Sequence, residues 1–258
     1  MNPIAKGIDI SHWQGNVNFE TVKAQGFDFV IIRCGAGNAN GVLYADEKFN
    51  SYYEAAKAAG LNVGTYFYAS GQFHTAGRWL KEAEYFANLI AGKQFEYPVA
   101  IDIECSPAGY AQTTTDNAIA LCEYLEKLGY YVTIYASDLS GFKSRLQLDR
   151  LEKFDKWVAR YNLTGPQYVK TFGMWQYGGS TNYINNVKVP GVESAACDQN
   201  YSYKDYPSII KNAGLNGFKT ANSPKLYKVT CGPVSKGDLD QYIALAKTQG
   251  VPYETQEV

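Results

Sequence analysis

The chain has 258 residues, of which 46% are hydrophobic and 19% are charged, as expected for a globular protein with a large core. Its 24 basic and 25 acidic residues are interspersed and give a net charge of -1, which argues against nucleic acid or an anionic membrane surface as the partner. No apolar run approaches the roughly 18 residues of a transmembrane helix, so membrane insertion is excluded. The length fits a single α/β barrel or two modest domains.

The N-terminal segment 1–6 lacks the apolar region of a signal peptide, so we expect a protein made in the cytoplasm without a signal peptide. Only His12 and His74 are present, which leaves little support for a Cys–His nucleophile or a metal-dependent hydrolase. The five cysteines are spaced neither as a disulfide framework nor as a zinc site, and we interpret them as reduced thiols: Cys34, Cys105, Cys122, Cys197 and Cys231.

Strand-like and helix-like runs alternate along the first half of the chain. The patterns predict strands at 7–11, 27–34, 61–69, 97–104 and 130–137, with helices at 18–25, 46–59, 76–90 and 115–128 between them. A short helical stretch near 140–146 then precedes strands at 156–162, 173–177 and 196–201. Eight strands, of which only the first five carry full-length crossover helices, predict an α/β fold that is an irregular TIM-like barrel.

The fourth predicted strand carries the pattern with the most chemical information. It is an apolar run with two carboxylates two residues apart, so Asp102 and Glu104 are expected on one face of the strand. Burying ionised carboxylates without partners is expensive, and desolvation and crowding raise one pKa above the other. Acid-catalysed glycoside cleavage requires this arrangement. The alternative is a strand end whose acids only hydrogen-bond to neighbouring loops.

Two more carboxylates occur in similar segments. Asp9 points to the opposite strand face from Ile8 and Ile10, and Asp198 lies in the last predicted strand. Barrel enzymes place their chemistry at the C-terminal ends of strands, so we expect the four acids at or near those ends, around one mouth. There the aspartates would crowd Glu104 with negative charge and raise its pKa toward the working pH.

Aromatic residues are unusually frequent, with 22 Tyr, 12 Phe and 4 Trp. Most of the tyrosines are expected to close the core with their hydroxyls at the surface. The excess favours a ligand with sugar rings, because amphipathic aromatic side chains are the usual platforms for sugar faces.

Four motifs in register resemble the glycoside hydrolase family 25 muramidases, the Chalaropsis-type lysozymes common among phage endolysins and bacterial autolysins. They are 9–15 (DISHWQG), the pair Asp102 and Glu104, 174–177 (MWQY) and 198–200 (DQN), and the resemblance covers about residues 4–212. It implies a (β/α)5(β)3 barrel and a lysozyme. Such an enzyme cleaves the β-1,4 bond between N-acetylmuramic acid and N-acetylglucosamine in peptidoglycan.

The resemblance also implies roles for individual residues. Glu104 resembles the general acid and Asp102 its partner, which would stabilise an oxazolinium formed when the substrate's own 2-acetamido oxygen attacks the anomeric carbon. Asp9 and Asp198 resemble the two outer acids. The implied substrate-binding residues are Arg33, which stands where many relatives carry Lys, and Tyr66, Tyr135, Trp175 and Gln176.

No cofactor is required for such a cleavage, and the expected partner is the glycan strand of peptidoglycan. The enzyme would reach the bacterial cell wall after holin-dependent or lytic release. A chitinase of the other substrate-assisted barrel family is less well supported, because it needs an additional Asp where this chain has Ala100. A non-catalytic sugar-binding barrel would have no use for four converging acids, whose repulsion only destabilises it.

The C-terminal tail is expected to be separate from the catalytic barrel, which we assign to 1–219, with a linker at 220–225. The remaining module, 226–258, would contain a strand at 226–230 and a helix at 237–249, and is too small to bury a good core alone. In lysins of the resembled family a C-terminal module commonly binds the cell wall. The alternative is a homo-oligomer formed through the strand at 226–230.

Overall fold

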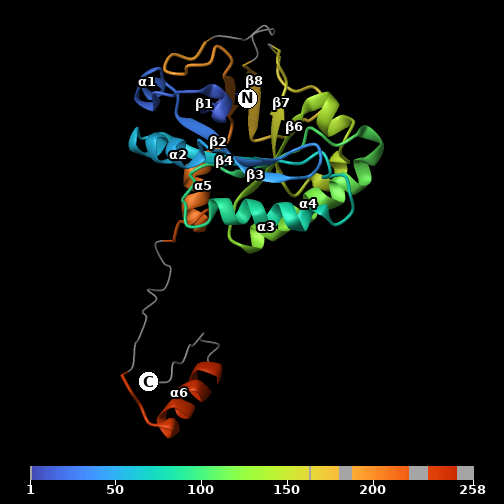
Figure 1. The fold of residues 1–258 in the computed structure, drawn as a ribbon. Helices are drawn as coiled ribbons and strands as arrows, with labels where there is room; N and C mark the ends of the chain where they lie inside the picture. The colour runs from blue at the N-terminus through green and yellow to red at the C-terminus, as the bar shows by residue number, and fades with distance from the viewer. Residues whose placement is uncertain (1, 163, 180–187, 221–231, 249–258) are drawn as a thin grey trace. The chain divides into compact units, whose positions relative to one another are not determined.

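The computed structural model describes residues 2–162, 164–179, 188–220 and 232–248, which Figure 1 shows in colour. Contacts along the chain separate one unit, Met1–Ala221, from a second unit, Asn222–Val258. The described part of the second unit contains helix α6 (Lys236–Thr248), on which Tyr242 and Leu245 are exposed. The strand expected at 226–230 lies outside the described residues. Within the described ranges, no helix is long and apolar enough to cross a membrane.

Eight strands of the first unit form a closed barrel. Seven are mutually parallel, the eighth (β9) is antiparallel to both of its neighbours, β8 and β1, and a pairing of β1 with β2 closes the ring. This confirms the irregular TIM-like barrel, including all eight predicted strands. The strands are β1 (Ala5–Ile10), β2 (Phe29–Gly37), β4 (Asn62–Tyr68), β5 (Val99–Asp102), β6 (Val132–Ser137), β7 (Asp155–Ala159), β8 (Met174–Gly178) and β9 (Asp198–Ser202).

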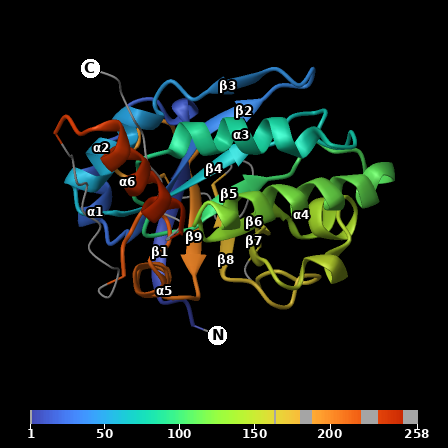
Figure 2. The same ribbon diagram turned by 90° about the horizontal axis from the view of Figure 1, so that it is seen from below.

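Helices on the outside connect the first five barrel strands, as predicted, and Figure 2 shows two of them, α3 and α4, side by side along the barrel. The fifth connection holds only a π-helical turn (Asp138–Lys143) and a 3-10 turn (Leu148–Leu151), which agrees with the short helical stretch expected near 140–146. The expectation of full-length helices after all five strands is therefore wrong for the last of them. A short strand, β3 (Leu43–Ala45), and a helix after β9, α5 (Tyr206–Ala213), were not predicted. The four connecting helices are α1 (Phe19–Ala24), α2 (Phe49–Ala58), α3 (Arg78–Ile90) and α4 (Ala111–Lys127).

Strand alternation divides the buried residues into an outer and an inner layer. Ile8 and Ile10 belong to the outer layer under the helices, whereas Phe29 and Trp157 point into the barrel and form one buried cluster with Tyr206 of α5. The inner layer is tight at Gly7, where a Cβ would lie 2.3 Å from the Phe29 ring, so only glycine fits. The lower half of the barrel, at the N-terminal ends of the parallel strands, is thereby filled. A ligand can enter only from the upper end, where the C-terminal ends of these strands lie.

Asn216 holds the lower end of the barrel together. Its side chain is fully buried, accepts a hydrogen bond from the Tyr131 amide at 2.7 Å, and donates to the Phe95 and Tyr97 carbonyls at 3.1 and 2.9 Å. Its φ of 53° is the left-handed region, which Asn tolerates better than other residues with a Cβ. The residue therefore joins the segment after α5 to the starts of two barrel strands.

We expect Asn216→Ala to lower the free energy of unfolding by about 3–6 kcal/mol, because three buried backbone groups lose their partners. Asn216→Gly should lose the same hydrogen bonds but recover about 1 kcal/mol relative to Ala, because glycine adopts the left-handed region freely. Urea unfolding of both variants, with the exposed change Asn50→Ala on α2 as control, measures this. Unfolding free energies within about 1 kcal/mol of wild type for both would contradict the assignment.

Candidate active site

The upper end of the barrel interior is polar, in contrast to the filled lower half. Inward positions near the C-terminal ends of the parallel strands bring together six of the residues expected in a site: Asp9, Arg33, Tyr66, Asp102, Tyr135 and Gln176. Asp198 also lies at this mouth, but not at the C-terminal end of its strand, as was expected. It begins its strand, and because β9 runs antiparallel, the N-terminal end of that strand lies at the mouth.

Asp9 is the most firmly held of the four acids. Its side chain is buried, and Oδ2 accepts hydrogen bonds from Gln176 Nε2 at 2.9 Å and Asn200 Nδ2 at 2.7 Å. Its pKa is raised to about 6, because loss of solvation, together with the negative charge of Glu104, outweighs the lowering effect of these two hydrogen bonds. At neutral pH a large fraction of Asp9 is ionised, and it is fixed in one orientation.

The two amides that hold Asp9 are themselves fixed by aromatic side chains. Gln176 Oε1 accepts from the hydroxyls of Tyr135 and Tyr161, both at 2.8 Å. Asn200 Oδ1 accepts from the indole Nε1 of buried Trp157 at 2.7 Å. Each amide therefore has its oxygen occupied by O–H or N–H donors, which leaves its NH2 group directed at the carboxylate.

Asp102 is the last residue of β5 and is 5% exposed. Its Oδ1 is buried without a hydrogen-bond partner, which leaves an acceptor open at the base of the mouth. Loss of solvation raises its pKa well above the usual range, and the charges of Glu104 and Asp9 add to this, while Arg33 acts in the opposite direction. Burial and the neighbouring charges therefore favour the protonated form of Asp102.

Glu104 lies two residues beyond the end of β5, not within a strand as expected. The residue is exposed at the rim, and the chain is held there by a hydrogen bond from the Ile103 amide to the Tyr135 carbonyl at 3.0 Å. Its pKa is raised, but the cause differs from the expected crowding: reduced solvation of the carboxylate by surrounding protein raises it. The Tyr135 hydroxyl and the Arg145 charge partly offset this effect. The repulsion acts in the other direction, because the charge of Glu104 raises the pKa values of the three aspartates.

Asp198 faces Asp9 directly, because the two residues are paired in the β1–β9 ladder. Its pKa is raised to about 8, first by loss of solvation and then by the charge of Asp9, while a hydrogen bond from Tyr161 opposes the rise. Gly179 passes so close that a Cβ there would lie 2.0 Å from Asp198 Oδ1. A side chain at position 179 would therefore displace this carboxylate.

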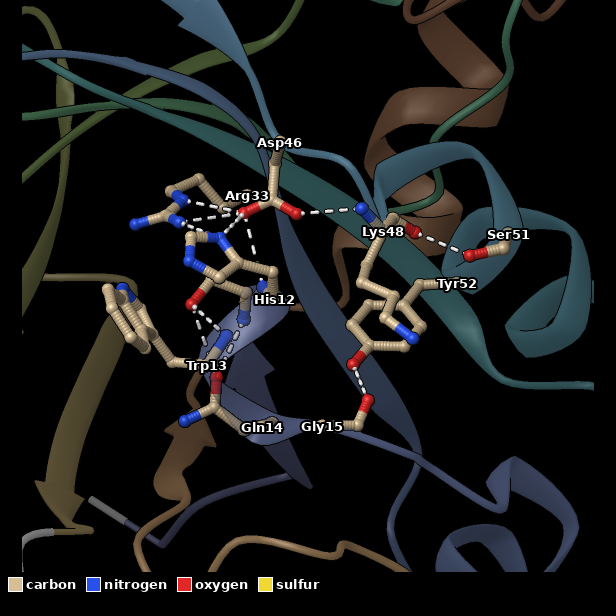
Figure 3. A network of polar contacts seen from close by, with 10 residues as sticks. His12, Trp13, Gln14, Gly15, Arg33, Asp46, Lys48, Ser51 and Tyr52 are labelled. Carbon is tan, nitrogen blue, oxygen red and sulfur yellow. Dashed lines mark hydrogen bonds and ion pairs between the residues drawn. The ribbon is translucent and has the colours of Figure 1, made fainter.

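Arg33 forms an ion pair outside the acid cluster, as Figure 3 shows. Its Nε and Nη2 lie 2.9 and 2.8 Å from Asp46 Oδ2, and Nη2 lies 2.6 Å from His12 Nδ1. Burial alone would raise the pKa of Asp46, but hydrogen bonds from His12 and Lys48 and the charge of Arg33 lower it below its usual value. The ionised form of Asp46 is thus favoured, and it fixes the Arg33 side chain.

The remaining two expected sugar-binding residues have different surroundings. Tyr66 points inward, packs edge-on against Trp157, and has its pKa raised far above the usual value, first by burial and then by the charge of Asp9. Trp175 alternates with inward Gln176 and so lies on the opposite strand face, where its Nε1 donates to the Arg160 carbonyl at 2.8 Å. The structure does not bring Trp175 to the acids.

Three residues of the site were assigned no role from the sequence, although one of them, Asn200, belongs to the 198–200 motif. Asn200 could have been found, since it lies two residues after Asp198 on the same strand face, and Tyr161 lies at the upper end of the β7 segment. Asp46 gave no local signal, because its partner Arg33 is on another element. The cysteines at 34, 105, 122 and 197 are free thiols, and no cluster of metal-ligating side chains occurs among the residues that the structure describes.

Two curated lysozymes are similar to this chain. The autolytic lysozyme of Clostridium acetobutylicum is 31% identical over 182 residues, a match that covers 70% of this chain and 53% of the relative. Lysozyme M1 of Streptomyces globisporus is 28% identical over 187 residues, covering 67% of this chain and 60% of the relative. The match therefore spans little more than half the length of these relatives.

Solved structures share the fold. The CTP1L endolysin superposes with a TM-score of 0.66 at 24% identity, covering 81% of this chain and 70% of that one. The bacterial lysozyme from Streptomyces coelicolor gives a TM-score of 0.63 at 23% identity, covering 81% of this chain and 98% of that one. The family model for glycosyl hydrolases family 25 matches residues 8–187, from β1 through β8. The chain therefore belongs to glycosyl hydrolases family 25.

Proposed function

We propose that this protein is a peptidoglycan hydrolase, an N-acetylmuramidase that cleaves the β-1,4 bond between N-acetylmuramic acid and N-acetylglucosamine in the bacterial cell wall. The observation that carries the proposal is the gathering of four carboxylates with raised pKa values at the open end of a family 25 barrel. The names of the related lysozymes and of the CTP1L endolysin agree with action on the cell wall.

In this proposal Glu104 is the general acid. It lies at the rim, where the glycosidic oxygen of a bound strand can reach it, and its raised pKa keeps a proton available. Glu104 protonates the leaving oxygen while the 2-acetamido oxygen attacks the anomeric carbon, and the glycosidic bond breaks. Water then opens the resulting oxazolinium and returns the proton to Glu104, so that atoms and charge balance over the cycle.

Asp102 is proposed to bind the acetamido group during this step. Its unpartnered Oδ1 is a suitable acceptor for the substrate's amide N–H. A hydrogen bond to the ionised form lowers a carboxyl pKa, so substrate binding would shift the proton of the pair from Asp102 toward Glu104. The resulting Asp102 carboxylate would stabilise the positive charge that develops on the oxazolinium.

Asp9 and Asp198 are proposed to orient the central pair and to set its proton affinity. Arg33, Tyr66, Tyr135 and Gln176 would line the site, Gln176 mainly by holding Asp9. For the C-terminal unit, binding to the cell wall and self-association stay predictions, and the same holds for the linker bounds and for release through a holin or lysis.

Glu104→Gln should lower muropeptide release from purified peptidoglycan by about 10²–10⁴-fold, because the amide has the same shape but no proton to give. Mass spectrometry of the wild-type products should show muramic acid at the reducing ends. Glu84→Gln, the same change at an exposed position on α3, is the matched control and should keep full activity. Activity retained by Glu104→Gln, or glucosamine reducing ends, would overturn the proposal.

Asp9→Asn should shift the alkaline limb of the kcat/KM profile to lower pH. The charge of Asp9 raises the pKa values of Asp102 and Asp198, whereas neutral Asn does not, so these two carboxyls should lose their protons at lower pH in the variant. The limb is measured on peptidoglycan from pH 4 to 9, with exposed Asp149→Asn as control. A limb that stays in place or moves to higher pH contradicts the coupling between these acids.

A further inference from the structure

Exposed aromatic rings are unevenly distributed over the barrel. Among the described residues of the first unit, the exposed aromatic side chains all lie on segments at the mouth end of the barrel: Trp13 after β1, Tyr44 on β3, Tyr110 after β5 and Tyr168 beside Asp138 after β6. At the opposite end the exposed apolar side chains are aliphatic, as at Ile4 and Leu128. Single exposed apolar residues are ordinary, but this one-sided placement of rings around an opening is characteristic of a binding surface.

Trp13 is the largest and most exposed of these rings, at 73% of its surface. It lies on a 3-10 turn (His12–Gln14) four residues after Asp9, at the rim of the mouth. In Figure 3 its ring and the Arg33 guanidinium project to the same side of this segment, away from Lys48 and Tyr52. The ring therefore lies on the side of the turn where the Arg33 guanidinium lies, and its exposure shows that it is not folded back on a helix.

The turn that carries Trp13 is held rigidly. The Ser11 hydroxyl and the Gln14 side chain cap the turn reciprocally, and Gln14 Nε2 donates to the Ala196 carbonyl at 3.2 Å. The His12 ring lies 4.5 Å from the Trp13 ring between centroids, and His12 is fixed in turn by its backbone and ring contacts to Asp46. A fixed, exposed ring binds a flat ligand face with little loss of side-chain entropy.

We propose that Trp13 is a stacking platform for a pyranose ring of the glycan strand outside the two sugars at the cleaved bond. The inference rests on the proposed muramidase function. The two sugars at the bond must lie over Asp102 and Glu104, so the strand that continues from them crosses the rim. A sugar presents an apolar C–H face to an aromatic ring while its hydroxyls stay in water. Trp13 thereby favours long strands and contributes to binding, with no part in the chemistry.

The test compares wild type, Trp13→Ala and Trp13→Phe on two purified substrates freed of peptide: long glycan strands and the shortest fragment with one cleavable bond. Trp13→Ala should raise KM for long strands about three- to tenfold, with kcat unchanged and the short fragment unaffected. Trp13→Phe should restore most of the affinity because it keeps a ring. Leu128→Ala, which removes an exposed apolar side chain at the far end of the barrel, is the matched control.

A second experiment separates the Trp13 platform from the proposed muramidase function. It compares the binding of the same long strands to the single variant Glu104→Gln and to the double variant Glu104→Gln, Trp13→Ala. Weaker binding by the double variant supports the platform even if wild type releases no muramic acid ends, an outcome that would sink only the proposed function. Equal binding by the two proteins, a fall in kcat, or an equal rise in KM on both substrates would overturn the platform. A changed sedimentation coefficient of Trp13→Ala with unchanged KM would also overturn it, by identifying the ring as a contact between copies of the chain.

Discussion

The antiparallel placement of β9 between β8 and β1 is the constraint on which the acid site depends. It pairs Asp198 with Asp9 across the ladder and places both at the mouth, although one begins its strand and the other lies near the end of its own. The same strand contributes Asn200, whose amide donates to Asp9. The strand that brings a second carboxyl group beside Asp9 therefore also supplies the hydrogen-bond donor that makes a buried carboxylate at position 9 tolerable.

The site keeps protons because burial removes solvation from its acids, and because Arg33, the cation that acts on Asp102, is engaged elsewhere. Arg33 lowers the pKa of Asp102 through space, but its Nε and Nη2 are bound to Asp46, so it does not form an ion pair with the acids. The raised pKa values of Asp9 and Asp198 mean that the folded protein holds protons that the unfolded chain releases. These two carboxyls therefore lower the free energy of unfolding as the pH rises from their ordinary pKa of 3.8, and the loss is complete above the folded values of about 6 and about 8. The proton supply for an acid catalyst is thus obtained at the expense of stability.

Strand periodicity was sufficient to predict the barrel and the inward positions of Asp9 and Asp102, because alternation depends only on local backbone geometry. It was wrong for Glu104, because β5 ends at Asp102 and the rule does not hold beyond the strand. The direction of β9 could not be read from its own sequence, since antiparallel pairing is decided by the neighbouring strands. Arg33 needed a partner, but the choice of Asp46 depends on the path of the β2–β3 hairpin, which was itself missed.

Asp46 connects the acid site with the rim. One oxygen, Oδ2, accepts from Arg33 Nε and from the His12 backbone amide, so a single carboxylate positions both the inward guanidinium and the turn that presents Trp13. His12 Nδ1 lies within hydrogen-bonding distance of Arg33 Nη2 and of Asp46 Oδ2, at 2.6 and 3.0 Å, but one ring nitrogen cannot accept from the first and donate to the second at once. An unprotonated Nδ1 ties the ring to Arg33, whereas a protonated one ties it to Asp46. The His12 amide holds the turn to Asp46 in both cases, so the position of the ring proton decides only which partner fixes the ring beside Trp13.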